Sequence, residues 1–201
     1  ASSAVLIEGN GIDVDIFRFI YRKNTSIKFI FASRLLIDKG IVEFINAAKA
    51  MHGNYEFIIC GGFDELNPKS IKKKYFHELI SSDHRIIYRG SLNKEDLIKE
   101  FYNANFFVLP SYREGLPQVA LEAAATGLPL ILSDVPGCNS CVVDQLNGFT
   151  CNARDTESLV HAFKKAVNIN NYDELSFNSR KMVVERFATK KIYEEFKKII
   201  N

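Results

Sequence analysis

Two glutamates, Glu114 and Glu122, stand with seven residues between them in the part of this sequence that is best suited to bind an anion. Gly115 lets the backbone come close to a ligand, and Pro117 suits the first turn of a helix because its missing N–H would have no partner there. The N–H groups beyond the proline lie at the positive end of the helix dipole. The segment therefore predicts a phosphate site at the start of a helix.

The two carboxylates are expected to hold opposite ends of a phosphorylated ligand. Glu122 lies about one turn inside the helix, and side chains tilt toward a helix's N-terminus, so its carboxylate can reach back along the surface that holds the phosphate. Ionised carboxylate oxygens only accept hydrogen bonds, which suits the two neighbouring hydroxyls of a ribose. Glu114 precedes the helix and is expected at the other end, beside a sugar attached to the phosphate.

Arg34 and Lys39 can supply the positive charge that a diphosphate needs. Arginine offers a planar fork of donors and lysine a flexible point charge, and the two complement each other around phosphate oxygens. A diphosphate leaving group gains negative charge as its bond to the sugar breaks, so stabilisation has to be directed at the phosphates. With both cations in place, neither a metal ion nor any other cofactor is required.

The elements that must position these groups alternate between strands and helices. Short apolar runs rich in Ile, Phe and Val predict strands at residues 27–33, 55–60, 85–88, 105–109 and 128–132. They are apolar almost throughout, which is typical of a parallel sheet covered on both faces. Helices are expected between them, at residues 40–51, 68–81, 94–103 and 116–126, with three more in the C-terminal quarter.

Three helix starts carry explicit capping signals. Asn67 followed by Pro68 predicts a cap with proline in the first turn, and Asn93 and Asp155 each precede a helical pattern that their side chains can cap. The order of elements predicts an α/β fold, a Rossmann-like three-layer doubly wound parallel sheet with extra C-terminal helices. Ligands of such sheets bind beyond the carboxyl ends of the strands, which is where Arg34 and Glu114 are expected.

Composition and charge exclude several classes of protein. Apolar residues make up 47% and charged residues 25%, which is typical of a folded globular chain, and 201 residues suit one domain. No run approaches the roughly 18 apolar residues that a spanning helix needs. A net charge of +2 gives no reason to expect a nucleic-acid partner. We therefore expect a cytoplasmic protein.

These motifs resemble the retaining B-type glycosyltransferases, the large family that includes bacterial capsule, O-antigen and lipid-linked oligosaccharide enzymes. The resemblance covers nearly the whole chain in the expected order: residues 10–13 (Asn-Gly-Ile-Asp), residues 32–40, Gly61-Gly62, Arg89-Gly90, residues 109–111 with 114–117, Glu122 and Asn147-Gly148. The sequence departs from the family after Cys138, where relatives often carry Arg-Glu and this chain has Asn139-Ser140.

The resemblance implies that residues 1–201 are the C-terminal donor-binding domain of a two-domain enzyme, without its N-terminal acceptor domain. Residues 1–25 would be an inter-domain linker region, 26–170 the Rossmann-like core and 171–201 the C-terminal helices. Arg34, Lys39 and Glu114 would be the catalytic groups, with Arg34 and Lys39 on the diphosphate, Glu114 on the sugar and Glu122 on the ribose. Further substrate contacts are implied at Gly62, Arg89, Gly90, Leu92, Gly115, Leu116, Gln118 and Val119.

The resemblance also implies a function. The chain would bind a nucleoside-diphosphate sugar, preferably a UDP-sugar, and the full-length enzyme would transfer a hexosyl group with retention through an oxocarbenium-like transition state. The acceptor would be a saccharide or a lipid-linked glycan in cell-surface polysaccharide synthesis, and the isolated domain would be inactive. A nucleotide-sugar epimerase of the same architecture and a non-catalytic nucleotide-binding module stay open as alternatives. A dehydrogenase domain is disfavoured because residues 33–40 lack a Gly-x-Gly-x-x-Gly turn.

Two short motifs favour a metal only weakly. Cys138 and Cys141 form one Cys-x-x-Cys without the second pair of ligands that a zinc site needs. Asp13 and Asp15 resemble the paired acids of another, metal-dependent glycosyltransferase architecture, but they precede the first predicted strand instead of following one. We therefore predict no metal site.

The last predicted helix is amphipathic. Residues 189–200 place Ile192, Phe196, Ile199 and Ile200 at helical spacing, with lysines on the other side. Packing against the other domain is the favoured use of this stripe, because apolar stripes of this period usually face protein. Contact with anionic lipid is the alternative, so peripheral association with the inner face of the cell membrane also stays open.

Overall fold

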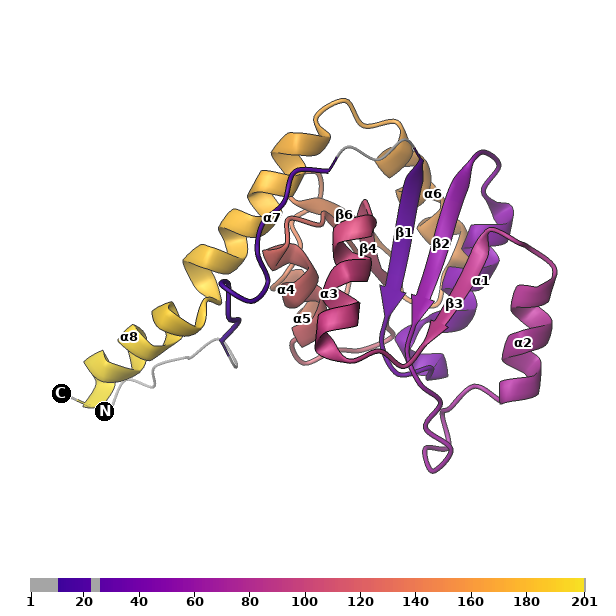
Figure 1. The fold of residues 1–201 in the computed structure, drawn as a ribbon, viewed down its shortest axis with the longest axis horizontal. Helices are drawn as coiled ribbons and strands as arrows, with labels where there is room; N and C mark the ends of the chain where they lie inside the picture. Colours follow the sequence, from indigo (N-terminus) through magenta and orange to yellow (C-terminus); the bar gives the residue numbers. More distant parts are fainter. Residues whose placement is uncertain (1–10, 23–25, 201) are drawn as a thin grey trace.

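A parallel six-stranded sheet forms the centre of the computed structural model, which describes residues 11–22 and 26–200 (Figure 1). Its strand order is β3-β2-β1-β4-β5-β6. The strands are β1 (Ile27–Ala32), β2 (Tyr55–Cys60), β3 (Ile86–Gly90), β4 (Phe106–Leu109), β5 (Leu130–Ser133) and β6 (Gly148–Cys151). Because the chain grows outward from β1 to β3 and then returns to start again at β4, a topological switch point lies between β1 and β4.

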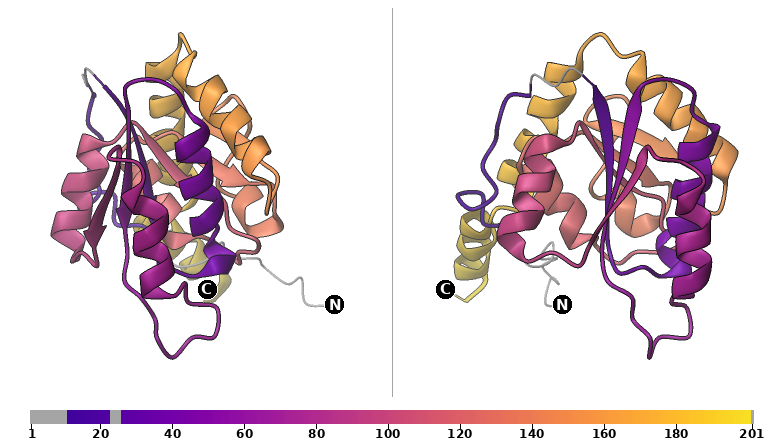
Figure 2. Two further views of the ribbon diagram at one scale, coloured as in Figure 1. Left: turned by 90° about the vertical axis from the view of Figure 1, so that its right-hand side faces the viewer. Right: turned by 45° about the vertical axis from the view of Figure 1, so that its right-hand side comes forward.

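Helices cover both faces of this sheet (Figure 2). On one face lie α1 (Ile41–Ala50), α2 (Lys73–Ser81) and α6 (Thr156–Val167), with α1 packed on α6. On the other lie α3 (Lys94–Asn103) and α4 (Gln118–Ala125). The short elements η1 (Ile37–Lys39) and α5 (Pro136–Asn139) follow β1 and β5, and α7 (Tyr172–Arg186) and α8 (Thr189–Ile200) end the chain. The predicted three-layer doubly wound fold with extra C-terminal helices is confirmed.

Two of the three predicted caps are confirmed. The Asn93 side chain accepts a hydrogen bond from the Asp96 amide, and the Asp155 side chain accepts one from the Ser158 amide. The predicted cap at Asn67 is wrong, because residues 67–70 form a turn in which the Asn67 side chain accepts from the Lys69 amide. The helix expected from residue 68 therefore begins at Lys73.

Other predicted boundaries also need correction. Pro117 is the N-cap of α4 and not its first helical residue, since its ψ of 91° is extended. Strand β6 has no counterpart among the predicted strands; it is four residues long and begins with a glycine, so it offers little apolar signal. Its register with β5 runs from Gly148 beside Leu130 to Cys151 beside Ser133.

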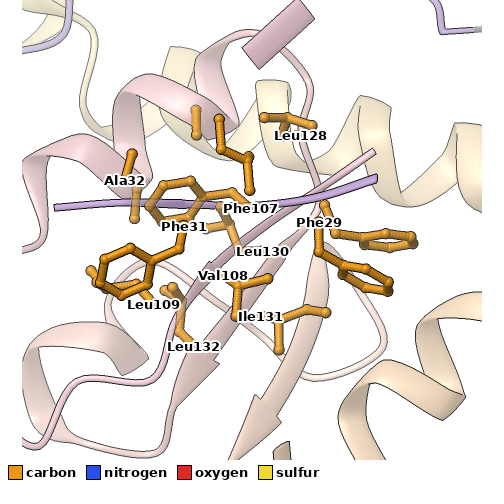
Figure 3. Close-up of a cluster of buried hydrophobic side chains, with 14 of the residues drawn as sticks. Phe29, Phe31, Ala32, Phe107, Val108, Leu109, Leu128, Leu130, Ile131 and Leu132 are labelled. Atoms are coloured by element: carbon orange, nitrogen blue, oxygen red, sulfur yellow. The ribbon is translucent and has the colours of Figure 1, made fainter. Parts of the chain in front are cut away.

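Aromatic residues fill the space between the sheet and its helices. Phe29 of β1 is fully buried and stacks on Phe57 and Phe106 from the two neighbouring strands, at centroid distances of 5.4 and 5.5 Å. Phe163 of α6 packs at 4.5 Å from the same ring. Figure 3 shows the buried side chains of β1, β4 and β5, including Phe31, Phe107 and Leu130, which continue this core. The core thus holds β1 and β4 rigidly, side by side.

Residues 11–22 run along α7 and are fastened to the domain (Figure 1). The Arg180 guanidinium donates to the carbonyls of Val14, Phe17 and Ala125. Arg22 donates to the carbonyl and hydroxyl of Thr126, and burial lowers its pKa. Of the predicted linker region 1–25, residues 1–10 and 23–25 lie outside the described part of the chain.

The amphipathic helix at the C-terminus is present as α8. Ile192 is buried, whereas Tyr193 and Phe196 are 59% and 47% exposed. The side chains of Ile199 and Ile200 lie outside what the structure describes. No helix among the described residues combines the length and apolar character needed to cross a membrane. The use of the exposed stripe stays a prediction.

We expect Phe29→Ala to lower the free energy of unfolding by about 3–5 kcal/mol, because it opens a cavity between three other aromatic rings. The matched change Phe177→Ala removes the same group from a side chain that is 56% exposed, and it should cost less than about 0.5 kcal/mol. Urea unfolding followed by circular dichroism measures both. Similar losses for the two variants would contradict this account of the core.

Candidate functional site

A cavity of about 220 Å³ opens at the carboxyl ends of β1, β2 and β3. It brings together four of the predicted site residues, which come from four different segments of the chain: Arg34, Gly62, Leu92 and Val119. The remaining residues that line it are Ala32, Ser33, Cys60, Gly61, Ser91 and Leu97. The cavity therefore lies where the parallel-sheet rule places a ligand.

Close backbone packing shapes this cavity. The Gly61 amide donates to the Gly90 carbonyl at 2.7 Å, and the Gly62 carbonyl accepts from the Leu35 amide at 2.9 Å. A Cβ at Gly61, whose φ is +157°, would collide with the Ser33 carbonyl. These positions join the ends of β1, β2 and β3 by main-chain contacts, so the space beyond them is left open for a ligand.

Lys39 and Glu114, which do not line this cavity, form an ion pair. The Lys39 Nζ lies 2.7 Å from the Glu114 Oε1, and the Ser111 hydroxyl donates to the same oxygen at 2.7 Å. The two side chains are only 23% and 9% exposed. Because the loops after β1 and β4 meet here, the two groups predicted to act on the diphosphate and the sugar lie within one hydrogen bond of each other.

Glycines hold these two loops in place. Gly40 adopts the left-handed conformation (φ +77°), and a Cβ there would collide with the Pro110 carbonyl. A Cβ at Gly137 of α5 would collide with the carbonyls of Glu114 and Gly115. By contrast, a Cβ at Gly115 would meet nothing within 4 Å. The loop after β4 thus packs against Gly137, whereas the space at Gly115, where a ligand is predicted, is open.

The start of α4 offers unoccupied donors next to the ion pair. The Pro117 carbonyl accepts from the amides of Ala120 and Leu121. Among the described residues, no acceptor is recorded for the Gln118 and Val119 amides, as is normal for a helix N-terminus. Val119 also lines the cavity that Arg34 lines. Lys39 pairs with Glu114, which stands four residues before Gln118 in the chain, so the role of both cations at a phosphate site stays a prediction.

Glu122 is half-buried on α4. Burial raises the pKa of its carboxyl, and the positive charge of Lys94 partly offsets this rise. No hydrogen bond of this carboxylate to another described residue is recorded. A half-buried acceptor without a protein donor is suited to ligand hydroxyls, although Glu122 is not among the residues that line the cavity.

Two predicted cations are already paired with acids. Arg34 is 63% exposed and its Nη1 lies 2.8 Å from the Oδ2 of Asp64, in the loop after β2. The Arg89 side chain lies against Glu100 of α3, with 3.0 Å between its Nε and the Oε1. Arg89 and Gly90 do not line the cavity, so contacts from this turn would have to come from the backbone. Gly115, Leu116 and Gln118 are also absent from its lining.

Sequence reasoning missed several groups around the site. Ser111 could have been found, because it stands three residues before Glu114 in the same motif. Asp64 could not, because its contact with Arg34 depends on the packing of a loop 30 residues away. The neighbouring contacts of Tyr112 with Glu43 and Arg154 also join segments that are distant in sequence.

The motifs weighed as metal sites have other contacts in the structure. Cys138 and Cys141 are buried thiols, and burial raises the pKa of Cys138 to about 12. The Asp13 carboxylate accepts from the amides of Asp15 and Ile16 and so closes a turn. Within the described ranges, no group of three or more His, Cys, Asp or Glu side chains is arranged to hold a metal ion.

Comparison with known proteins identifies the family. The model of the family described as glycosyl transferases group 1 matches residues 13–185, and this chain belongs to that family. The predicted resemblance is therefore confirmed.

Relatives of this chain include named bacterial glycosyltransferases. The capsular polysaccharide biosynthesis glycosyltransferase CapM of Staphylococcus aureus is 27% identical in an alignment of length 207 that covers 100% of this chain and 53% of that protein. The UDP-Gal:alpha-D-GlcNAc-diphosphoundecaprenol alpha-1,3-galactosyltransferase of Escherichia coli is 28% identical, over 94% of this chain and 51% of that protein. The chain thus spans about half the length of these two relatives.

Solved structures share the fold. Sucrose-phosphate synthase from Thermosynechococcus elongatus superposes with a TM-score of 0.83 at 23% identity, over 95% of this chain and 50% of that one. Anabaena HepE in complex with UDP-glucose superposes with a TM-score of 0.81 at 17% identity, over 94% of this chain and 55% of that one. The C-terminal domain of the glycosyl transferase group 1 protein LpcC from Francisella tularensis gives 0.76 at 18% identity, over 89% of this chain and 99% of that one.

The raised pKa of Glu122 predicts a pH-dependent stability. The folded protein binds the Glu122 proton up to a higher pH than the unfolded chain does, so ionisation lowers the free energy of unfolding as the pH rises above the usual glutamate range. We expect Glu122→Gln to be more stable than the wild type at pH 7 and equally stable below about pH 4.

Thermal unfolding across this pH range measures the difference. Glu65→Gln, at an exposed glutamate, is the matched control and should show no such pH dependence. A Glu122→Gln variant that is less stable than the wild type at pH 7 would show that the carboxylate has a stabilising partner.

Proposed function

We propose that this chain binds a nucleoside-diphosphate sugar at the carboxyl edge of its sheet, with the diphosphate at the start of α4. The observation that carries this proposal is the ion pair of Lys39 with Glu114, four residues before the start of α4, where the amides of Gln118 and Val119 have no acceptor among the described residues. An ammonium and helix N-terminal amides together form a site for phosphate oxygens. The Glu114 carboxylate, which accepts hydrogen bonds, lies next to them and can bind the hydroxyls of the attached sugar.

The rest of the nucleotide fits the surroundings of this pair. Arg34 can turn from Asp64 to the diphosphate, because its side chain is exposed and its guanidinium has further donors. The base would occupy the cavity beside Gly62 and Leu92, near the backbone of Arg89 and Gly90. The ribose would lie between this cavity and Glu122. UDP is the preferred nucleotide, and the HepE complex with UDP-glucose, which shares the fold, supports this preference.

The reaction we propose is transfer of a hexosyl group with retention of configuration, without a metal or other cofactor. Lys39, Arg34 and the amides beyond Gly115 and Leu116 would stabilise the charge that develops on the departing diphosphate. Glu114 would hold the sugar as it passes through an oxocarbenium-like state. These three side chains are therefore the proposed catalytic groups.

The complete enzyme would need a second domain for its acceptor. The curated relatives are about twice as long as this chain, and their names describe capsule synthesis and a diphosphoundecaprenol-linked acceptor. We propose that residues 26–170 are the donor-binding core, that 171–201 pack back toward an N-terminal acceptor domain, and that this chain alone is inactive. The acceptor would be a saccharide or a lipid-linked glycan, used on the cytoplasmic side of the cell membrane.

We expect Arg34→Ala to weaken UDP binding about ten- to a hundredfold and to leave uridine binding unchanged. A hydrogen bond to a charged group contributes about 1.5–3 kcal/mol, and 1.4 kcal/mol corresponds to a factor of ten. Calorimetric titration measures this, beginning with UDP, GDP and ADP on the wild type to establish the base. Arg18→Ala removes an equally charged, exposed side chain far from the cavity and is the control. An equal loss for uridine and UDP would refute the assignment of Arg34 to the diphosphate.

Glu122→Ala should weaken the binding of uridine and the binding of UDP by the same factor, about tenfold, because both ligands contain the ribose. Deoxyuridine nucleotides provide an independent check, since a missing 2′-hydroxyl should reduce the effect of the substitution. If Glu122→Ala left the affinities for uridine, UDP and the deoxyuridine nucleotide at wild-type values, the ribose would have to bind elsewhere.

A further inference from the structure

A second cavity, of about 270 Å³, is lined in part by the two loops that carry Lys39 and Glu114. It is lined by Ile37, Asp38, Lys69, Tyr112, Arg113 and Arg154, none of which was predicted as a site residue. Its three cations come from three separate loops, after β2, β4 and β6. Asp38 is the one carboxylate in this lining. The lining therefore carries a net positive charge.

Arg154 is held in place by its surroundings. Its guanidinium lies over the ring of Tyr112, with 4.6 Å between the Cζ and the ring centroid. The Tyr112 hydroxyl donates to the Glu43 Oε1 at 2.6 Å, and burial raises the pKa of this tyrosine, which keeps it protonated. The hydrogen bond to Glu43 thus holds the Tyr112 ring in place, and the ring in turn positions the Arg154 guanidinium.

Two features of Arg154 point to a ligand. Its φ of +61° is left-handed, which a side chain other than glycine adopts rarely and which is concentrated at functional positions. In the described part of the chain, no carboxylate is recorded as its ion-pair partner. Arg154 is exposed, its guanidinium is held over the Tyr112 ring, and no carboxylate of the described residues pairs with it, so it is suited to bind an anion from outside the chain.

The other two cations share a single carboxylate oxygen. The Asp38 Oδ2 lies 2.9 Å from the Lys69 Nζ and 3.9 Å from an Arg113 nitrogen. The Asp38 Oδ1 is buried without a hydrogen-bond partner among the described residues. One carboxylate cannot satisfy the donors of two guanidinium groups and one ammonium. The unused donors favour a group with several anionic oxygens.

We propose that this second cavity binds a phosphate group, separate from the diphosphate of the donor. Planar guanidinium forks and an ammonium arranged around one space match the oxygens of a phosphate. Asp38 and Arg113 are the sequence neighbours of Lys39 and Glu114, so this phosphate would lie next to the site where the sugar is transferred. We infer that it belongs to a phosphate-bearing acceptor, a step that rests on the proposed function.

The site is tested by titrating inorganic phosphate into the chain saturated with UDP, with binding followed by amide chemical shifts. We expect shifts at Lys69, Arg113 and Arg154 that saturate, and Arg154→Gln should weaken this binding at least about tenfold by removing a charge-assisted pair. Lys74→Gln removes one charge from a side chain that is 91% exposed and should have no effect. Equal losses for both variants, or no saturable shifts, would overturn the proposal.

A second substitution separates binding from folding. Arg154→Gly relieves the left-handed conformation, so its melting temperature should equal or exceed that of the wild type while phosphate binding is lost. Retained phosphate binding in this variant would contradict the assignment. UDP affinity should be unchanged in both Arg154 variants, whereas Arg34→Ala should weaken UDP binding and leave phosphate binding at this cavity unchanged. Failure of the wild type to bind UDP would refute the proposed function, and the phosphate site would then be tested by the same titration without UDP, read at Lys69, Arg113 and Arg154.

The source of the phosphate is tested with two further probes. Geranyl diphosphate represents an organic diphosphate ester, and glucose 1-phosphate represents a sugar phosphate. Binding of either at least about tenfold tighter than inorganic phosphate, with loss in Arg154→Gln, supports a phosphate-bearing acceptor. Equal affinity for all three probes would overturn the acceptor assignment and leave a site for free phosphate.

Discussion

The arrangement at the edge of the sheet depends on one partly desolvated ion pair. Lys39 and Glu114 are largely withdrawn from water, where an unpaired charge is costly, and their charged atoms lie 2.7 Å apart. The Ser111 hydroxyl completes the coordination of the carboxylate. The pair binds the loop after β1 to the loop after β4.

The topology of the sheet explains why the pair lies where it does. β1 and β4 are neighbours at the point where the strand order reverses, with Phe29 paired to Phe106, although 73 residues separate the end of β1 from the start of β4. Loops on the two sides of such a switch point diverge and leave a crevice. The aromatic stack around Phe29 holds the two strands together from within, and Gly40 and Gly137 let the two loops approach closely from outside. Core and site therefore depend on the same pair of strands.

The sequence predicted the elements whose signals are local. The caps at Asn93 and Asp155 lie within four residues of their partners, and the five long apolar runs could be read directly as strands. Asn67 carries the same signal but closes a turn instead, because Ser70 and Ile71 pair with the loop at Leu35 and Leu36. The pairing of Arg34 with Asp64 and the position of Arg154 over Tyr112 depend on how distant loops pack, for which spacing in one sequence gives no signal. The family motifs identified Lys39 and Glu114, whose roles toward a ligand stay predictions.

The central claim is that the diphosphate of a nucleotide lies between the Lys39–Glu114 pair and the first turn of α4. The most direct measurement is the difference between the amide chemical shifts of the chain saturated with UDP and saturated with uridine. This difference isolates the phosphates, and the account predicts that it is largest at Gly115, Leu116, Gln118 and Val119 and at the loop that carries Lys39. A difference centred on any other part of the sheet edge, with these amides unmoved, would contradict it.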